Sequence, residues 1–126
     1  MAAVQTGKIR RFFQSQLGQR LLKSPSIHRE VPFNMVIKAH EVLEGMAESD
    51  EELLLQGVID LYFQEGDELV LVDYKTDYIS PENRSELIQQ YSIQLQLYKT
   101  ALERILGQKV KESYLYLFHT EEEVRL

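Results

Sequence analysis

Residues 53–76 read LLLQGVIDLYFQEGDELVLVDYKT and carry the strongest strand signal in the chain. Two runs rich in Val, Leu, Ile, Tyr and Phe, residues 53–64 and 68–76, flank the short segment Glu65-Gly66-Asp67. A Gly-Asp pair between two runs of high β-propensity indicates a hairpin with a tight turn. The stretch therefore predicts two antiparallel strands around which the rest of the chain is organised.

The predicted hairpin carries charged side chains within an otherwise apolar pattern. Asp60 lies on the first strand, while Asp73 and Lys75 are two residues apart on the second, so those two side chains leave the same face. Charged groups in a sheet core are costly unless they pair or bind a ligand. A simpler alternative is a solvent-side Asp–Lys ion pair worth less than about 1 kcal/mol.

Oxygen ligands from two carboxylates suit Mg²⁺ or Mn²⁺ rather than a soft metal. The backbone carbonyl of Tyr74, between Asp73 and Lys75, could complete the protein's share of the ligands. Lys75 could then hold a water molecule, help to deprotonate it, or offset charge on a phosphorane-like transition state. The reaction that uses this set of groups is metal-assisted hydrolysis of a phosphodiester.

The residues before the hairpin predict a helix and then a strand. Apolar residues recur at helical steps from about Thr6 to Lys23, and Gly18 could divide this segment into two helices. Residues 27–37 alternate apolar and polar, which predicts a half-buried strand. Pro32 cannot donate a ladder hydrogen bond, so this strand lies at an edge or carries a bulge.

The sequence contains two further acidic features in this region, Glu30 and the acid-rich segment 38–52. Glu30 lies on the opposite face of the strand from its apolar residues, where it faces either solvent or the site. Residues 38–52 are rich in acids that lack the fixed spacing of a metal site, so we expect an exposed loop with at most one helical turn.

A long helix is predicted after the hairpin. Ser80 suits the N-cap, Pro81 suits the first turn, and Gly107 suits the end of a helix that runs to about Leu106. Gln94 falls within the apolar stripe of this helix and must find partners or lose about 1–3 kcal/mol. Tyr91 lies on the same stripe, where plain core packing is the simplest interpretation.

The end of the chain predicts one more strand. Residues 111–118 are apolar on both faces, which is typical of an interior strand, and the preceding helix is a suitable crossover for parallel pairing. The acid-rich tail from His119 is expected to be exposed. The predicted class is therefore α/β, with a mixed sheet of about four strands flanked by helices and a single domain over residues 1–126.

Charge distribution, cysteine content and the length of apolar runs indicate which partners and which cell compartment to expect. The formal net charge is −6, but residues 1–40 hold seven Lys or Arg residues against one Glu, which gives either a local basic face or a solvated helix surface. Cysteine is absent, so neither a disulfide framework nor a thiolate metal site is expected. No apolar run approaches about 20 residues and no secretory signal is present, so we expect a cytoplasmic protein without a membrane partner.

Three segments resemble a known family when taken together. Gly57-Val58-Ile59-Asp60, Val72-Asp73-Tyr74-Lys75-Thr76-Asp77 and Gln94-Leu95-Gln96-Leu97-Tyr98 resemble the motifs of the PD-(D/E)xK nuclease superfamily. Within it the chain is similar to the RecB-type nucleases, whose late helix carries a Gln-x-x-x-Tyr motif, and to the C-terminal nuclease domain of the AddA family of helicase–nuclease subunits. Residues 13–20 and 29–33 resemble that family as well, so the resemblance covers nearly the whole chain.

The resemblance implies a role for each matching residue and a restriction-endonuclease-like core with the order α-β-β-β-α-β. Asp60 matches the first metal-binding acid, Asp73 the second, and Lys75 the catalytic lysine. Gln94 and Tyr98 match the late-helix motif that borders the site and contacts the lysine or DNA. Plain core packing is the alternative for Tyr98.

The resemblance also implies a function: a Mg²⁺-dependent (or Mn²⁺-dependent) exonuclease-type domain of an ATP-dependent helicase/nuclease in double-strand break repair and recombination. Its expected partners are DNA, single-stranded in particular, the helicase domains of the parent subunit, and a second nuclease subunit. The alternative is a non-catalytic DNA-binding or scaffold module that keeps the nuclease fold.

One family feature does not match. RecB-type nucleases place a metal-binding histidine on a helix before the first strand, and none of His28, His40 and His119 has that context. We therefore expect the chain to be a fragment that lacks an upstream helix, and its activity in isolation to be reduced. The chain also has no Gly-x-x-x-x-Gly-Lys-Ser/Thr loop for ATP, so helicase activity would belong to other domains.

Overall fold

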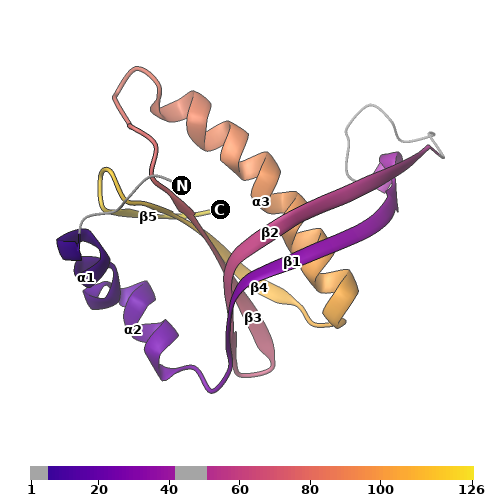
Figure 1. The fold of residues 1–126 in the computed structure, drawn as a ribbon, viewed down its shortest axis with the longest axis horizontal. Helices are drawn as coiled ribbons and strands as arrows, with labels where there is room; N and C mark the ends of the chain where they lie inside the picture. The colour runs from indigo at the N-terminus through magenta and orange to yellow at the C-terminus, as the bar shows by residue number, and fades with distance from the viewer. Residues whose placement is uncertain (1–5, 42–50) are drawn as a thin grey trace.

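The computed structural model describes residues 6–41 and 51–126. They form a five-stranded mixed sheet in the order β1-β2-β3-β4-β5, with two short helices on one face and one long helix on the other (Figure 1). The predicted α/β class is confirmed, with five strands in place of about four. None of the described helices combines the length and the hydropathy that a bilayer-spanning segment requires.

The elements follow one another in a simple order along the chain. They are α1 (Thr6–Gln14), α2 (Gln16–Lys23), β1 (Ile27–Lys38), the 3₁₀ turn η1 (Ala39–Glu41), β2 (Glu52–Glu65), β3 (Glu68–Lys75), α3 (Arg84–Leu106), β4 (Val110–Leu117) and β5 (Glu122–Arg125). The predicted β2–β3 hairpin is confirmed, with antiparallel pairing from Leu61↔Val72 to Glu65↔Glu68. Gly66 adopts φ 64° in the turn, a conformation that glycine reaches without strain. Of the acid-rich loop expected over residues 38–52, residues 42–50 lie outside the described part.

The long helix and its crossover are confirmed, but its start is not. β4 pairs parallel to β3 and lies between β3 and β5, and Gly107 closes α3 with φ 66°. The sequence predicts Ser80 as the N-cap, whereas Asn83 occupies that position. Ser80 N–H donates to Asn83 Oδ1 at 2.8 Å and Asn83 N–H donates to Ser80 Oγ at 3.3 Å. Residues 80–83 therefore close on themselves as a turn before the helix begins.

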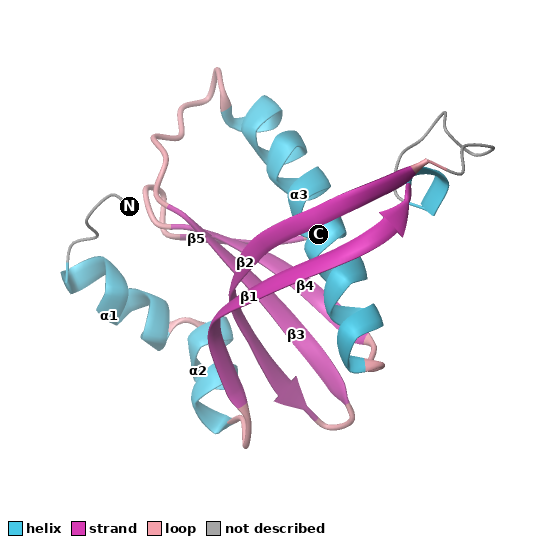
Figure 2. Cartoon of the chain, turned by 45° about the vertical axis from the view of Figure 1, so that its right-hand side comes forward, coloured by secondary structure: helices cyan, strands magenta, loops and turns pink. Residues whose placement is uncertain are grey.

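β1 and β2 form a long ribbon at one edge of the sheet, as Pro32 predicted. Figure 2 shows this ribbon passing across α3, and Phe33 of β1 makes an edge-to-face contact with Tyr98 of α3. Glu30 is exposed, has φ 52°, and falls in a gap of the register between Arg29↔Leu61 and Val31↔Ile59. The register does not shift across this gap, so Glu30 lies opposite Asp60 and faces solvent without a bulge.

The sheet buries apolar side chains on both of its faces. On one face, Ile59, Leu71 and Leu115 pack with Leu95 of α3 in a first cluster. On the other face a second cluster joins the sheet to α1 and α2, with Phe12, Leu17, Leu21, Leu61, Phe63, Val70, Val72, Tyr116 and Phe118. This alternation along β3 matches the two faces expected from the sequence.

The predicted N-terminal helix is divided, but at Ser15 rather than at Gly18. Ser15 is the N-cap of α2, and its Oγ accepts a hydrogen bond from Gly18 N–H at 3.0 Å. Gly18 lies inside α2, where a β-carbon would come within 2.1 Å of Phe12 O and 2.6 Å of Phe13 Cα. Gly18 is therefore required for the close approach of α2 to the end of α1.

We expect Gly18→Ala to destabilise the protein by about 3 kcal/mol, because backbone atoms of α1 would have to move. Thermal or urea unfolding would measure this loss. Gly7→Ala is the matched control, since there the nearest atom to a β-carbon is the flexible Arg11 Nη1 at 3.3 Å. Equal unfolding free energies for the two variants would contradict the close-approach argument.

The C-terminal tail is exposed as the sequence predicts, since none of residues 119–126 is buried, but it also forms a strand that the sequence did not predict. Residues 122–125 form β5, which pairs antiparallel with β4 from Tyr114↔Arg125 to Leu117↔Glu122. Glu123 Oε1 accepts a hydrogen bond from Leu17 N–H at 3.1 Å, so this carboxylate satisfies a free amide at the start of α2.

Two arginines of the basic N-terminal segment form ion pairs with glutamates elsewhere in the chain. Arg20 bridges Glu65 at 2.7 Å and Glu112 at 2.9 Å, and Arg11 Nε lies 2.5 Å from Glu121 Oε1. Arg20 and, to a lesser extent, Lys111 outweigh burial and hold the pKa of Glu65 to about 2. These contacts favour a structural role for Arg11 and Arg20 over a basic binding face.

Candidate active site

The candidate site forms where β2 separates from β3. The ladder between these strands ends at Leu61↔Val72, so Tyr74 N–H has no strand partner on that side. Asp60, the next residue along β2, places its Oδ2 2.9 Å from Tyr74 N and accepts its hydrogen bond. A carboxylate thus replaces the missing strand, which fixes Asp60 at the opening between the two strands.

Asp73 is buried beside Asp60, with only 4% of its surface exposed. Burial is the main cause that raises the pKa of Asp73 to about 6, and the Asp60 carboxylate within hydrogen-bonding reach adds to it. The Lys75 ammonium opposes this effect only in part. Two carboxylates held this closely repel each other unless a cation or a proton lies between them.

Lys75 connects the acids to the long helix. Its Nζ lies 3.0 Å from Asp73 Oδ2 and donates a hydrogen bond to Gln94 Oε1 at 2.7 Å. Gln94 Nε2 in turn donates to Tyr98 Oη at 3.0 Å. The structure therefore brings all five predicted residues together in one connected group. Both polar atoms of the Gln94 amide therefore have hydrogen-bond partners, as its position in the apolar stripe of α3 requires.

A glycine and an aromatic pair support the far end of this group. An added β-carbon at Gly57 would meet the Phe33 ring at 3.1 Å and the Tyr98 ring at 3.2 Å. Both distances are shorter than ordinary van der Waals contacts of a β-carbon, so the absence of a side chain at Gly57 leaves space for the Tyr98 ring beneath the β1–β2 ribbon. Tyr98 is half-buried and combines core packing with its hydrogen bond to Gln94. Burial raises its pKa, so the hydroxyl stays protonated.

Two residues beside the lysine are not identified from the sequence as parts of the site. The sequence indicates only core packing for Tyr91, and Asp77 appears there only as the last residue of a segment that resembles the superfamily. In the structure the Tyr91 hydroxyl donates to Asp77 Oδ2, and the Tyr91 ring lies 4.8 Å from Lys75 Nζ. The available signal was the spacing: Tyr91 precedes Gln94 by three residues, so both leave the same face of the helix.

The donor atoms fit a hard divalent cation. Asp73 Oδ2 is fully buried and receives no hydrogen bond, although Lys75 lies close to it as an ion-pair partner. Lys75 O accepts from Phe118 N–H toward β4, so the Tyr74 carbonyl, one residue earlier, points to the opposite edge, where Asp60 lies. Two carboxylates and this carbonyl are the oxygen ligands that Mg²⁺ and Mn²⁺ prefer.

Within the described residues, no histidine joins Asp60 and Asp73 in a group that could hold a metal ion. No group of three or more His, Cys, Asp or Glu side chains there could hold a metal ion. His119 Nδ1 accepts a hydrogen bond from Ile79 N–H at 3.0 Å, and His28 stacks on Tyr62. These two histidines therefore contact other groups of the protein.

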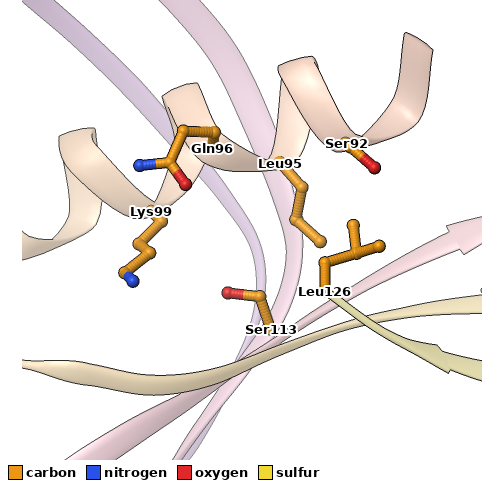
Figure 3. Close-up of a pocket in the computed structure, with 6 residues that line it drawn as sticks. All are labelled: Ser92, Leu95, Gln96, Lys99, Ser113 and Leu126. Atoms are coloured by element: carbon orange, nitrogen blue, oxygen red, sulfur yellow. The ribbon is translucent and has the colours of Figure 1, made fainter. Parts of the chain in front are cut away.

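A small hollow elsewhere on the molecule is separate from the acids. It lies between α3 and β4 and is lined by Ser92, Leu95, Gln96, Lys99, Ser113 and Leu126 (Figure 3). Its volume of about 50 Å³ is far below the roughly 300–1,000 Å³ of small-molecule sites. The candidate site is therefore the group around Asp73 rather than this hollow.

We expect Gln94→Met to lower the cleavage rate about 10–100-fold while leaving the fold intact. Methionine fills the volume but cannot accept from Lys75 Nζ or donate to Tyr98, so the lysine loses its fixed position, and small misplacements near the reacting atoms are costly. Steady-state cleavage kinetics measure the loss. Gln96→Met, on the exposed side two residues away, should cleave at the wild-type rate.

The mixed sheet with helices on both faces and an Asp, Asp and Lys group is the arrangement of one class of nucleases. A model of the PD-(D/E)XK nuclease superfamily matches residues 2–125, and the chain belongs to this superfamily. Nucleases of this superfamily generally use divalent metals.

Particular relatives point to one kind of enzyme, the AddA subunit of the bacterial ATP-dependent helicase/nuclease. The AddA protein of Syntrophomonas wolfei is 49% identical over 126 residues, which is 100% of this chain and 10% of the relative. The protein of the same name from Acetivibrio thermocellus is 51% identical over 119 residues, 92% of this chain and 10% of the relative. The one from Clostridium acetobutylicum is 43% identical over 126 residues, 98% of this chain and 10% of the relative. The chain thus spans about a tenth of the length of these relatives.

Proposed function

We propose that this chain is the nuclease domain of an ATP-dependent helicase/nuclease and hydrolyses DNA phosphodiester bonds with the help of Mg²⁺ or Mn²⁺. The observation that carries the proposal is the pair Asp60 and Asp73, held beside Lys75 with Asp73 Oδ2 buried and without a hydrogen bond. An ion pair between Lys75 and Asp73 alone would not account for the second carboxylate, Asp60, held beside the buried Asp73. The superfamily match over residues 2–125 supports the same reading.

Each residue of the group has a proposed role. Asp60, Asp73 and the Tyr74 carbonyl hold the cation, which when bound supplies Lewis-acid polarisation of the phosphate. Hydrolysis adds a water oxygen to phosphorus and breaks the bond to the sugar oxygen, and negative charge grows on the phosphoryl oxygens. Lys75 Nζ–H donates to one of these oxygens and offsets that charge. We assign Lys75 this cationic role because its Nζ already pairs with Asp73 and donates to Gln94.

Gln94 and Tyr98 act on the lysine rather than on phosphorus. The Gln94 carbonyl fixes Lys75 Nζ, and the Tyr98 hydroxyl fixes the orientation of the Gln94 amide. The Tyr98 ring is held in turn by Phe33 and by the space that Gly57 leaves. The β1–β2 ribbon thus supports the geometry of the site from outside it.

The relatives support a set of partners. By analogy with these helicase/nuclease proteins, we propose that the substrate is DNA, that single strands are delivered by helicase domains of the same polypeptide, and that a second nuclease subunit completes the enzyme. Exonuclease-type cleavage in double-strand break repair and recombination is the corresponding role. No ATP loop lies in this chain, so unwinding would depend on those other domains.

Calorimetric titration of the protein with Mg²⁺ and Mn²⁺ tests the proposal. We expect binding at millimolar or lower concentration in the wild type, and loss of binding in Asp73→Asn, because Asn removes an anionic ligand. Cleavage of single-stranded DNA is measured in parallel. Absence of metal binding together with absence of cleavage would favour the alternative, a non-catalytic DNA-binding or scaffold module.

A further inference from the structure

Tyr91 is a buried aromatic residue whose contacts exceed what packing requires. It leaves α3 on the same face as Gln94, and 8% of its surface is exposed. Its ring belongs to the apolar cluster between α3 and the sheet. Leucine could fill that packing role, so the ring face and the hydroxyl need a separate account.

The ring face and the hydroxyl of Tyr91 both contact β3 or the residues that follow it. The ring centroid lies 4.8 Å from Lys75 Nζ, within the range in which an aromatic face attracts an ammonium group. The hydroxyl donates to Asp77 Oδ2, two residues beyond Lys75. Burial, aided by Asp77, raises the pKa of Tyr91, so the hydroxyl remains a donor at neutral pH.

The position of Lys75 Nζ depends on contacts because its side chain is long and flexible. Asp73 lies 3.0 Å from Nζ, Gln94 lies 2.7 Å from it, and the Tyr91 ring covers it at 4.8 Å. Asp73 is on the strand of the lysine itself, while the other two come from α3. The Tyr91–Asp77 bond also joins α3 to the chain that follows β3. Tyr91 therefore restrains both the ammonium group and the end of its strand.

Resting on the proposed function, we propose that Tyr91 is a positioning residue for Lys75. Its ring face holds the ammonium group beside the two carboxylates, and its hydroxyl, through Asp77, steadies the end of β3. Tyr91 does not touch the substrate in this account, so it should affect the rate of cleavage and not the binding of DNA.

Three substitutions test this in the full-length enzyme. Tyr91→Leu and Tyr91→Met remove the ring face, and we expect each to lower kcat about tenfold or more while KM stays within about twofold. Tyr91→Phe keeps the ring and loses only the bond to Asp77, so it should retain most of kcat. Wild-type kcat in both ring-less variants overturns the proposal, as does a loss in Tyr91→Phe equal to that in Tyr91→Leu.

A second measurement does not depend on activity or on a bound metal. Brief acetylation of the folded chain with acetic anhydride, followed by mass spectrometry, reports the access of Lys75 Nζ. We expect Tyr91→Met to speed acetylation of Lys75 several-fold relative to Tyr91→Phe, with the exposed Lys109 unchanged as an internal reference. Equal rates at Lys75 in the two variants overturn the proposal, and a folded Tyr91→Met protein suffices if Tyr91→Leu does not fold.

Lys75→Met separates this inference from the function on which it rests. If Lys75→Met abolishes cleavage and the ring-less Tyr91 variants cleave normally, only the positioning role fails. If Lys75→Met itself cleaves like wild type, the proposed site fails, whatever the Tyr91 variants do.

Discussion

Asp73→Asn is expected to abolish DNA cleavage and, at pH 7.5 without metal, to raise the melting temperature by about 10 °C. The two effects have one cause. Asp73 is 4% exposed and lies beside the Asp60 carboxylate, and this environment raises its pKa from 3.8 to about 6. Keeping Asp73 ionised in the folded protein therefore costs about 3 kcal/mol above pH 6. Asparagine removes that cost together with the anionic ligand.

The raised pKa of Asp73 also predicts how the stability gain in Asp73→Asn changes with pH. Because the folded pKa lies above the unfolded one, protonation of Asp73 stabilises the fold below about pH 4, and this stability is lost as the pH rises through 6. The gain in Asp73→Asn should therefore shrink when melting is repeated at pH 4.5. Asp67→Asn, the same change at an exposed turn residue, should leave the melting temperature unchanged. A gain that grows toward low pH would contradict the assigned cause.

Lys75→Met is expected to reduce cleavage about 10²–10³-fold, because it removes the donor that offsets phosphate charge. Methionine keeps most of the apolar stem, so the loss reports the ammonium group. The same change leaves Asp73 and Asp60 without a cation, which should destabilise the metal-free protein by about 3 kcal/mol at neutral pH. The destabilisation should fall below pH 6, where Asp73 takes up a proton.

Cleavage kinetics and thermal melting across pH measure both effects of Lys75→Met. Lys109→Met is the matched control, since its side chain is 74% exposed and lies 3.7 Å from Glu68 in a surface pair. Such pairs contribute about 1 kcal/mol or less. Wild-type cleavage by Lys75→Met would contradict the assigned role, and equal melting losses for the two lysine variants would contradict the argument from burial.

The sequence predicted the elements whose signals are local. The β2–β3 hairpin, the edge strand with Pro32, the interior strand β4 and the end of α3 at Gly107 all followed from periodicity or turn chemistry. It missed β5, because four residues rich in glutamate have little strand preference of their own and are held by pairing with β4. It also placed the start of α3 at Ser80, since a turn and a helix start share the same residue types.

The candidate site residues were predicted from the sequence alone: an Asp on each hairpin strand, a Lys two residues on, and a Gln on an apolar helix stripe. Their convergence needed the folded chain. β2 leaves β3 beyond Leu61, which exposes Tyr74 N–H to Asp60, and α3 crosses back so that Gln94 reaches Lys75. The contact of Tyr91 with Lys75 likewise depends on how α3 lies over the sheet. Periodicity records which face a residue occupies, whereas distances across elements arise only when packing sets their separation and angle.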